Sequence, residues 1–176
     1  MDIEVLDRFF AALTVAGGVA GIGLVVWALV DLRGLGRSVG PLLLPLATLV
    51  ATGATVGSLI YSEVFERIPC ALCWYQRIFM YSAAVIGILA LIRRRDRGVL
   101  PYMGTLATVG AAISVVHILD QNTRWFESPV CRADVPCSAK YVDVLGFVSI
   151  PVMALGSFIL IAAACFIAHR LTGDET

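Results

Sequence analysis

Uncharged apolar runs dominate this sequence of 176 residues. Five of them are almost free of charge in their central parts and long enough, as helices, to cross a bilayer core of about 30 Å, which needs ~20 residues. Lipid offers no partner to unpaired backbone groups, so each run predicts one spanning helix. The runs are residues 9–30, 42–62, 74–92, 99–119 and 148–168.

The composition leads to the same class. The chain is 59% hydrophobic and 15% charged, whereas soluble domains average roughly 45–50% apolar and 25% charged residues. We therefore expect an all-α integral membrane protein in a lipid bilayer. The formal net charge is zero, which gives no indication of nucleic-acid binding. The flank before residue 9 is acidic and no cleavage signature follows, so we interpret the first run as a retained helix.

Five crossings would place the two termini on opposite sides of the membrane. The basic residues are nearly balanced, with seven on the side of the C-terminus and six on the other. The densest cluster, at 93–97, lies close to helix ends, where positive charge favours the cytoplasm. We therefore expect the N-terminus outside and the C-terminus in the cytoplasm. Four of the five cysteines then fall in extracytoplasmic loops, where disulfides persist.

Cys70 and Cys73 form a Cys-x-x-Cys motif at the start of the third run. Such motifs commonly lower the pKa of one thiol. We expect the helix from Trp74 onward, which puts Cys73 at its N-terminus, where free amides and the helix dipole stabilise a thiolate. Arg77 adds a cation one turn later on the same face. An arginine within a span indicates a functional site unless it reaches the headgroups.

Cys131 and Cys137 lie in the long loop between the fourth and fifth runs. Alone they predict a structural disulfide. With two pairs on one face, a thiolate of one pair can attack the disulfide of the other and pass two electrons along. The acceptor would be lipid-soluble, because haem attachment needs a histidine where Trp74 stands. The lone Cys165 is interpreted as a small hydrophobe.

His117 and Gln121 stand four residues apart at the outer end of the fourth run, at about the depth of Arg77. They are candidates to donate hydrogen bonds to a quinone carbonyl, or they simply cap the helix. Two other interpretations of the cysteines stay open. One is a zinc site of four cysteines, which an oxidising compartment disfavours. The other is a membrane scaffold with inert disulfides.

Two stretches resemble a known family. The string CALCWYQRIFMY at 70–81 and the string VPCSAKYVDVLGFVSIP at 135–151 are similar to the disulfide bond formation protein B (DsbB) family, above all to its BdbC-like branch. Quinone or vitamin K epoxide reductase-like enzymes continue their motif differently after the cysteines. The resemblance implies a DsbB-like four-helix transmembrane domain over 42–176 in a bacterial cell membrane. Residues 1–41 would add an N-terminal transmembrane helix and a cytoplasmic loop.

The resemblance also implies an activity. The protein would reoxidise an extracytoplasmic thioredoxin-fold oxidase of the DsbA or BdbD kind and pass the electrons to ubiquinone or menaquinone, with no metal. By position, Cys131 would form the mixed disulfide with the partner and Cys137 would exchange with Cys70. Cys73 would face the quinone, supported by Arg77. His117 matches the histidine that the family places near the quinone, and Gln121 repeats its spacing to a glutamine.

Overall fold

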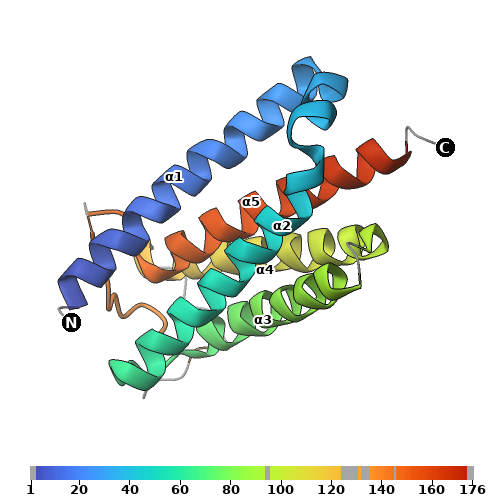
Figure 1. Cartoon of the computed structure of the whole chain (residues 1–176). Helices are drawn as coiled ribbons and strands as arrows, with labels where there is room; N and C mark the ends of the chain where they lie inside the picture. Colours follow the sequence, from blue (N-terminus) through green and yellow to red (C-terminus); the bar gives the residue numbers. More distant parts are fainter. Residues whose placement is uncertain (1–2, 94–95, 124–130, 132–134, 145, 174–176) are drawn as a thin grey trace.

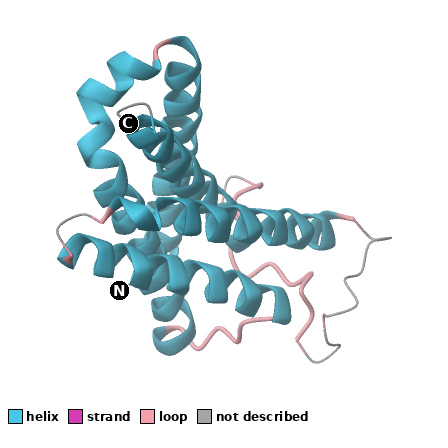
Figure 2. Ribbon diagram, turned by 90° about the vertical axis from the view of Figure 1, so that its right-hand side faces the viewer, coloured by secondary structure: helices cyan, strands magenta, loops and turns pink. Residues whose placement is uncertain are grey.

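The computed structural model describes residues 3–93, 96–123, 131, 135–144 and 146–173, without the side chains at 33, 37, 172 and 173. Within these ranges the chain is helical apart from loops and one isolated β-bridge (Figure 2). Five helices are long and apolar enough to cross a membrane, so the predicted class is confirmed. They are α1 (Ile3–Val30), α2 (Leu32–Leu59), α3 (Ala71–Ile92), α4 (Leu100–Asn122) and α5 (Ile150–Gly173).

Helices α2 to α5 pack side by side as a bundle, and α1 lies outside it, mainly against α5 (Figure 1). Small residues let the helices approach closely, as is usual in lipid. Gly17 and Gly21 of α1 face Leu160 of α5. Gly110 of α4 faces the ring of Phe158, which is fully buried in α5. Gly17 and Gly21 of the first run therefore serve packing, whereas a Cβ atom at Gly18 or Gly23 would meet nothing within 4 Å.

The start of α2 differs from the prediction. Residues 31–41 were expected to form a loop, but α2 begins at Leu32, directly after Asp31. The Asp31 carboxylate accepts a hydrogen bond of 2.9 Å from the Gly34 amide, which caps the helix. Pro41 and Pro45 lie inside the helix. Hydropathy does not indicate a helix over residues 32–41, because polar and basic residues lower the mean hydropathy there. The segment is nevertheless helical, and its Leu35 is fully buried.

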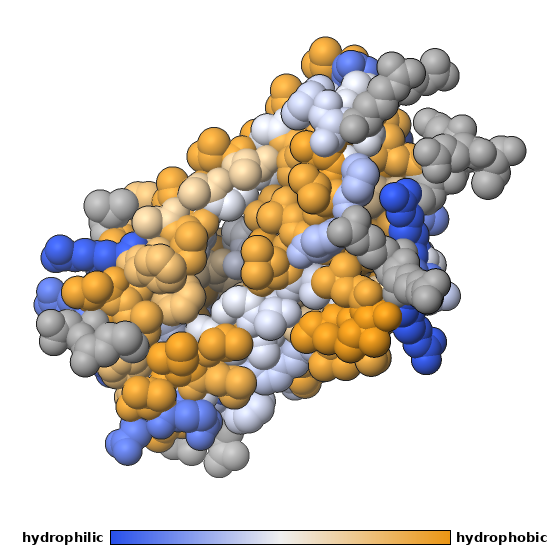
Figure 3. Space-filling model, in the orientation of Figure 1, coloured by the Kyte–Doolittle hydropathy of each residue, from blue (hydrophilic) through white to orange (hydrophobic). Residues whose placement is uncertain are grey.

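The two ends of the bundle differ. The N-terminus, the 65–70 loop and the segment before α5 lie at one end, and the C-terminus and the α1–α2 junction lie at the other (Figure 1). Large apolar side chains are exposed along the helices between the ends, as contact with lipid requires (Figure 3). Four basic residues used to predict the orientation lie outside the described residues: Arg94, Arg95, Arg124 and Arg132.

Candidate functional site

The Cys-x-x-Cys motif opens α3. The helix begins at Ala71 rather than at Trp74, so that Cys70, not Cys73, is its N-cap residue. The Sγ atom of Cys70 accepts a hydrogen bond of 3.4 Å from the Cys73 amide and lies 3.0 Å from the Sγ atom of Cys73. Both cysteines are free thiols, Cys70 buried and Cys73 half-buried. An amide in the first turn of α3 therefore stabilises the sulfur of Cys70.

The environment of Cys70 favours its thiolate. The hydrogen bond shared with the Cys73 thiol, helped by His117 and by the Cys73 amide, lowers the pKa of Cys70 to about 4 although burial opposes the shift. The sequence placed the stabilised thiolate on Cys73. The structure differs because the helix starts earlier, so that Cys70 is the N-cap residue and its sulfur accepts the hydrogen bond of the Cys73 amide.

The second pair is closed and packed against the first. Cys131 and Cys137 form a disulfide. Cys137 is 1% exposed and shares a buried cluster with Cys70 and Leu72, while Cys131 is half-buried at the edge of that cluster. Four cysteines from two distant segments are thus brought together, as the sequence predicted. Cys165 is fully buried in the core, as expected of a small hydrophobe.

His117 joins the two pairs. Its Nε2 atom lies 3.7 Å from the Cys70 Sγ atom and 3.2 Å from the carbonyl oxygen of Cys137. One turn later, the side-chain amide of Gln121 donates a hydrogen bond of 3.4 Å from its Nε2 atom to the Ala139 carbonyl. Both residues line a small pocket with Cys70, where the His117 Nδ1 and Gln121 Oε1 atoms are buried without a partner among the described residues. Their contact with a quinone stays a prediction.

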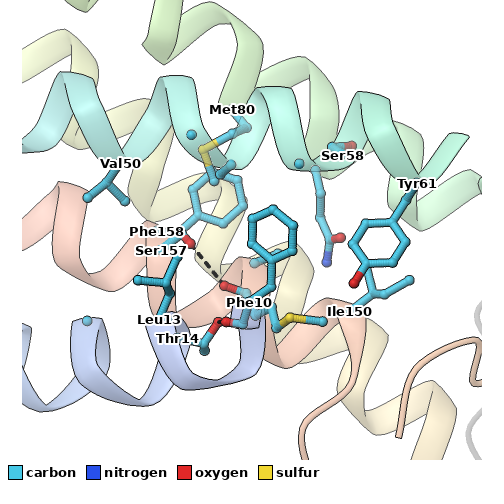
Figure 4. A pocket seen from close by; sticks show the side chains of 18 of the residues that line it. Phe10, Leu13, Thr14, Val50, Ser58, Tyr61, Met80, Ile150, Ser157 and Phe158 are labelled. Atoms are coloured by element: carbon cyan, nitrogen blue, oxygen red, sulfur yellow. Dashed lines mark hydrogen bonds between the residues drawn. The ribbon is translucent and has the colours of Figure 1, made fainter. Parts of the chain in front are cut away.

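A larger cavity lies on the other side of Cys73. It has a volume of about 620 Å³, within the roughly 300–1,000 Å³ of small-molecule sites. Helices α1, α2, α3 and α5 form its walls, which are mainly apolar (Figure 4). The surface is hollowed between α1 and α2 (Figure 3). Four residues of α3 bring polar groups to the wall: Cys73, Gln76, Arg77 and Tyr81.

Arg77 is held in this wall. Its guanidinium group donates a hydrogen bond of 3.0 Å to the Ser58 carbonyl and lies 5.3 Å from the centre of the Trp74 ring. The Ser58 carbonyl comes just before the π-helical turn Ile60–Val64, where the regular hydrogen-bond pattern of α2 changes. Arg77 therefore shares the cavity with Cys73, as its spacing of four residues predicted.

The geometry of the thiols argues against zinc. The ligand atoms of Cys70, Cys73 and His117 lie within 4.8 Å of one another. Two thiolates on one tetrahedral zinc ion, with Zn–S bonds near 2.3 Å, lie about 3.8 Å apart, whereas these sulfurs are 3.0 Å apart. The other two cysteines are used in a disulfide. The cluster therefore fits a reactive dithiol better than a four-cysteine zinc site.

Two contributors to the site were missed at the sequence level. Gln76 is buried and donates a hydrogen bond of 3.1 Å to the hydroxyl of Ser114 in α4. A glutamine inside an apolar run is itself a signal, since polar side chains in lipid need partners. The Ser58 carbonyl had no such signal, because only the local geometry of α2 makes it available.

Comparison with known proteins identifies the family. The model of the family described as "Disulfide bond formation protein DsbB" matches residues 41–168, which is most of the chain. The chain belongs to the DsbB family. This DsbB-family protein is a multi-pass membrane protein of disulfide bond formation that contains both cysteine pairs. The resemblance of the two cysteine-containing stretches is thereby confirmed.

Several curated relatives of this DsbB-family protein are named as disulfide formation proteins. Disulfide bond formation protein C of Bacillus subtilis (strain 168) is 44% identical over 113 residues, or 64% of this chain and 81% of the relative. Probable disulfide formation protein C of Bacillus cereus is 40% identical over 118 residues, or 66% and 84%. The probable disulfide formation protein of Oceanobacillus iheyensis is 40% identical over 120 residues, or 67% and 79%. No solved structure matches significantly.

Proposed function

We propose that this DsbB-family protein is a quinone-dependent oxidoreductase that reoxidises an extracytoplasmic thioredoxin-fold oxidase of the DsbA or BdbD kind. One observation carries the proposal. The two cysteine pairs share a buried cluster, and one of its sulfurs, that of Cys73, opens onto an apolar cavity among the membrane-spanning helices. The names of the relatives, which refer to disulfide formation, support the same activity.

The outer pair receives the electrons. A thiolate of the reduced partner attacks the Cys131 sulfur, which is the more exposed of the two. A mixed disulfide forms with the partner, the Cys131–Cys137 bond breaks, and Cys137 leaves as a thiolate. The second thiolate of the partner then attacks its own sulfur in the mixed disulfide. This releases Cys131 and leaves the partner oxidised.

The inner pair takes the electrons onward. The Cys137 thiolate attacks Cys70 in an oxidised Cys70–Cys73 pair, with which it is packed, and Cys73 leaves as a thiolate into the cavity wall. Cys131 then attacks Cys137 and restores the outer disulfide, which leaves Cys70 and Cys73 reduced. The structure has the same arrangement of an outer disulfide and an inner dithiol.

The cavity suits the acceptor. A quinone accepts two electrons and two protons and becomes a quinol, while the Cys70–Cys73 disulfide forms again. The apolar walls fit a lipid-soluble ring, and its volume is within the range of small-molecule sites. Cys73 supplies the reducing sulfur. Arg77, fixed on the Ser58 carbonyl, places a permanent positive charge where negative charge develops. The proposal covers ubiquinone and menaquinone alike.

We also propose the placement in the cell. The protein lies in the bacterial cell membrane with its N-terminus and both cysteine-containing segments outside and its C-terminus in the cytoplasm. The presence of both pairs at the end of the bundle that also holds the N-terminus supports this orientation, because the partner and the disulfides belong to an oxidising compartment (Figure 1).

Anaerobic turnover of the purified protein tests the proposal. A reduced thioredoxin-fold partner is mixed with enzyme and either ubiquinone or menaquinone, and the absorbance of the quinone is followed. We expect quinone to be consumed in proportion to partner thiols, and Cys73→Ser to abolish the reaction. Cys165→Ala is the matched control, since Cys165 is buried in the core away from both pairs. Normal quinone reduction by Cys73→Ser would contradict the role of Cys73.

A further inference from the structure

Helix α1 forms one wall of the cavity that Cys73 and Arg77 also line. The family match begins at residue 41 and therefore leaves α1 outside. Yet α1 contributes a continuous part of the cavity wall, opposite the residues that α3 brings to it. These α1 residues are Phe10, Leu13, Thr14, Ala16, Gly17 and Ala20.

Phe10 bridges the gap between α1 and α2. A Cβ atom on Gly57 of α2 would lie 2.9 Å from the Cζ atom of Phe10, so that only glycine at 57 leaves room for the ring. The rings of Phe10 and Tyr61 have centroids 6.0 Å apart. Figure 4 shows the Phe10 ring reaching from α1 into the cavity near Ser58, whose carbonyl holds Arg77.

Further contacts fix α1 in this position. The Tyr61 hydroxyl donates a hydrogen bond to the Asp7 carboxylate, which ties the outer end of α1 to the end of α2. Further along, the Cβ atom of an alanine at Gly156 of α5 would come within 2.9 Å of the Thr14 side chain. Gly21 lies directly against Leu160. Helix α1 is thus anchored on both sides of the cavity.

We infer that α1 is a wall of the acceptor site and that the quinone ring packs against Phe10, an inference that rests on the proposed function. The ligand class is an isoprenoid quinone, whose planar ring suits an aromatic wall and whose carbonyl oxygens suit the guanidinium donor of Arg77. A family member without such a helix would leave this side of the cavity to lipid. The helix before residue 41 is therefore part of the site of electron exit.

The Michaelis constant for quinone tests the role of Phe10. We expect Phe10→Ala to raise KM for a short-chain ubiquinone about tenfold, and Phe10→Leu to raise it less, because part of the apolar contact remains. The kcat at saturating quinone and the KM for the partner should stay unchanged. Phe9→Ala is the matched control, since Phe9 is 56% exposed and does not line the cavity. Equal KM values for Phe10→Ala and Phe9→Ala would overturn the role of Phe10 and leave the proposed function standing.

A second measurement needs no substitution. A photoreactive azidoquinone is cross-linked to the wild-type protein, and the labelled peptides are mapped by mass spectrometry. We expect label within residues 10–20 as well as near Cys73 and Arg77. Label confined to α2–α5 would overturn the inference. Wild-type protein that reduces no quinone at all would overturn the proposed function, and this inference with it.

Discussion

The sulfur of Cys70 is contacted by three hydrogen-bonding groups. The thiol of Cys73, the imidazole of His117 and the Cys73 amide all lie next to it. A sulfur that carries negative charge at neutral pH is a good leaving group in thiol–disulfide exchange. In the proposed relay Cys137 attacks this same sulfur and forms a disulfide with it. When Cys131 then attacks Cys137, Cys70 leaves as a stable thiolate.

The low pKa of Cys70 predicts a flat pH dependence of its alkylation. Because the pKa of Cys70 is lowered to about 4, the thiolate fraction is nearly constant from about pH 5 to about pH 8. Iodoacetamide alkylates the Cys70 thiolate to a thioether, and mass spectrometry of the peptide that contains Cys70 follows the reaction. His117→Ala removes one stabilising neighbour and should raise the pKa, whereas His169→Ala, at the other end of the bundle, should not. A rate that rises tenfold per unit through pH 8 would contradict the prediction.

The lowered pKa of Cys70 also makes the stability of the reduced protein depend on pH. The folded pKa of Cys70 lies below its ordinary value of 9.0, so the thiolate stabilises the reduced protein fully only above that ordinary value. The contribution falls with decreasing pH and is lost as the pH drops through about 4.

The sequence contained the motif, the cation and the second pair. It could not indicate which sulfur is favoured, because that depends on where the first turn of α3 begins.

Close contact between α4 and α5 defines the packing of the bundle. Gly110 leaves the space that the Phe158 ring occupies, and this ring is fully buried. A Cβ atom at position 110 would overlap the Cζ atom of Phe158, so that the ring would have to shift. Helix α4 also carries His117 and Gln121, and α5 follows the second cysteine pair.

Gly110→Ala is therefore expected to destabilise the protein. Overpacking of a well-packed core costs about 1–3 kcal/mol, more than the helix propensity gained from alanine. Thermal unfolding in detergent measures the loss. Gly23→Ala is the control, since a Cβ atom at Gly23 meets nothing within 4 Å. Equal stability of the two variants would show that Phe158 moves aside.

At the level of elements, hydropathy identified all five helices but not their first residues. The interiors of the spans are apolar because lipid requires it, so they are visible in any sequence. Helix starts depend on capping groups such as the Asp31 carboxylate and the Cys70 sulfur, which stand in polar stretches without a hydropathy signal. Contacts between distant helices, such as Gly57 with Phe10, leave no periodic pattern at all.

The whole molecule is divided into two unlike ends. One end holds both cysteine pairs and the first residues of α3 and α5. The other end holds the α1–α2 junction and the C-terminus (Figure 1). The cavity begins at the cysteine end and extends between the helices toward the middle of the bundle. In the proposed function, this arrangement would let a water-soluble partner and a lipid-soluble acceptor react at separate places on the same protein.

A membrane-impermeant maleimide tests the orientation. Intact cells are mildly reduced to open the Cys131–Cys137 disulfide and are then treated with the reagent from outside. We expect label on Cys131, because its sulfur is the more accessible of the pair. Cys165 serves as the internal control and should stay unlabelled, since it is fully buried. Label that appears on Cys131 only in inverted vesicles would reverse the proposed topology.

The connection between α1 and α2 consists of the single residue Asp31. Asp31 lies at the end of the bundle opposite the cysteines, far from the part of the cavity that Phe10 lines. About 30 Å of helix separates Asp31 from Phe10, and a tilt of about 5° moves Phe10 by roughly 3 Å. The contacts of Asp7 with Tyr61 and of Phe10 with Gly57 therefore decide the width of the gap beside Phe10, because the link at Asp31 is too far away to fix it.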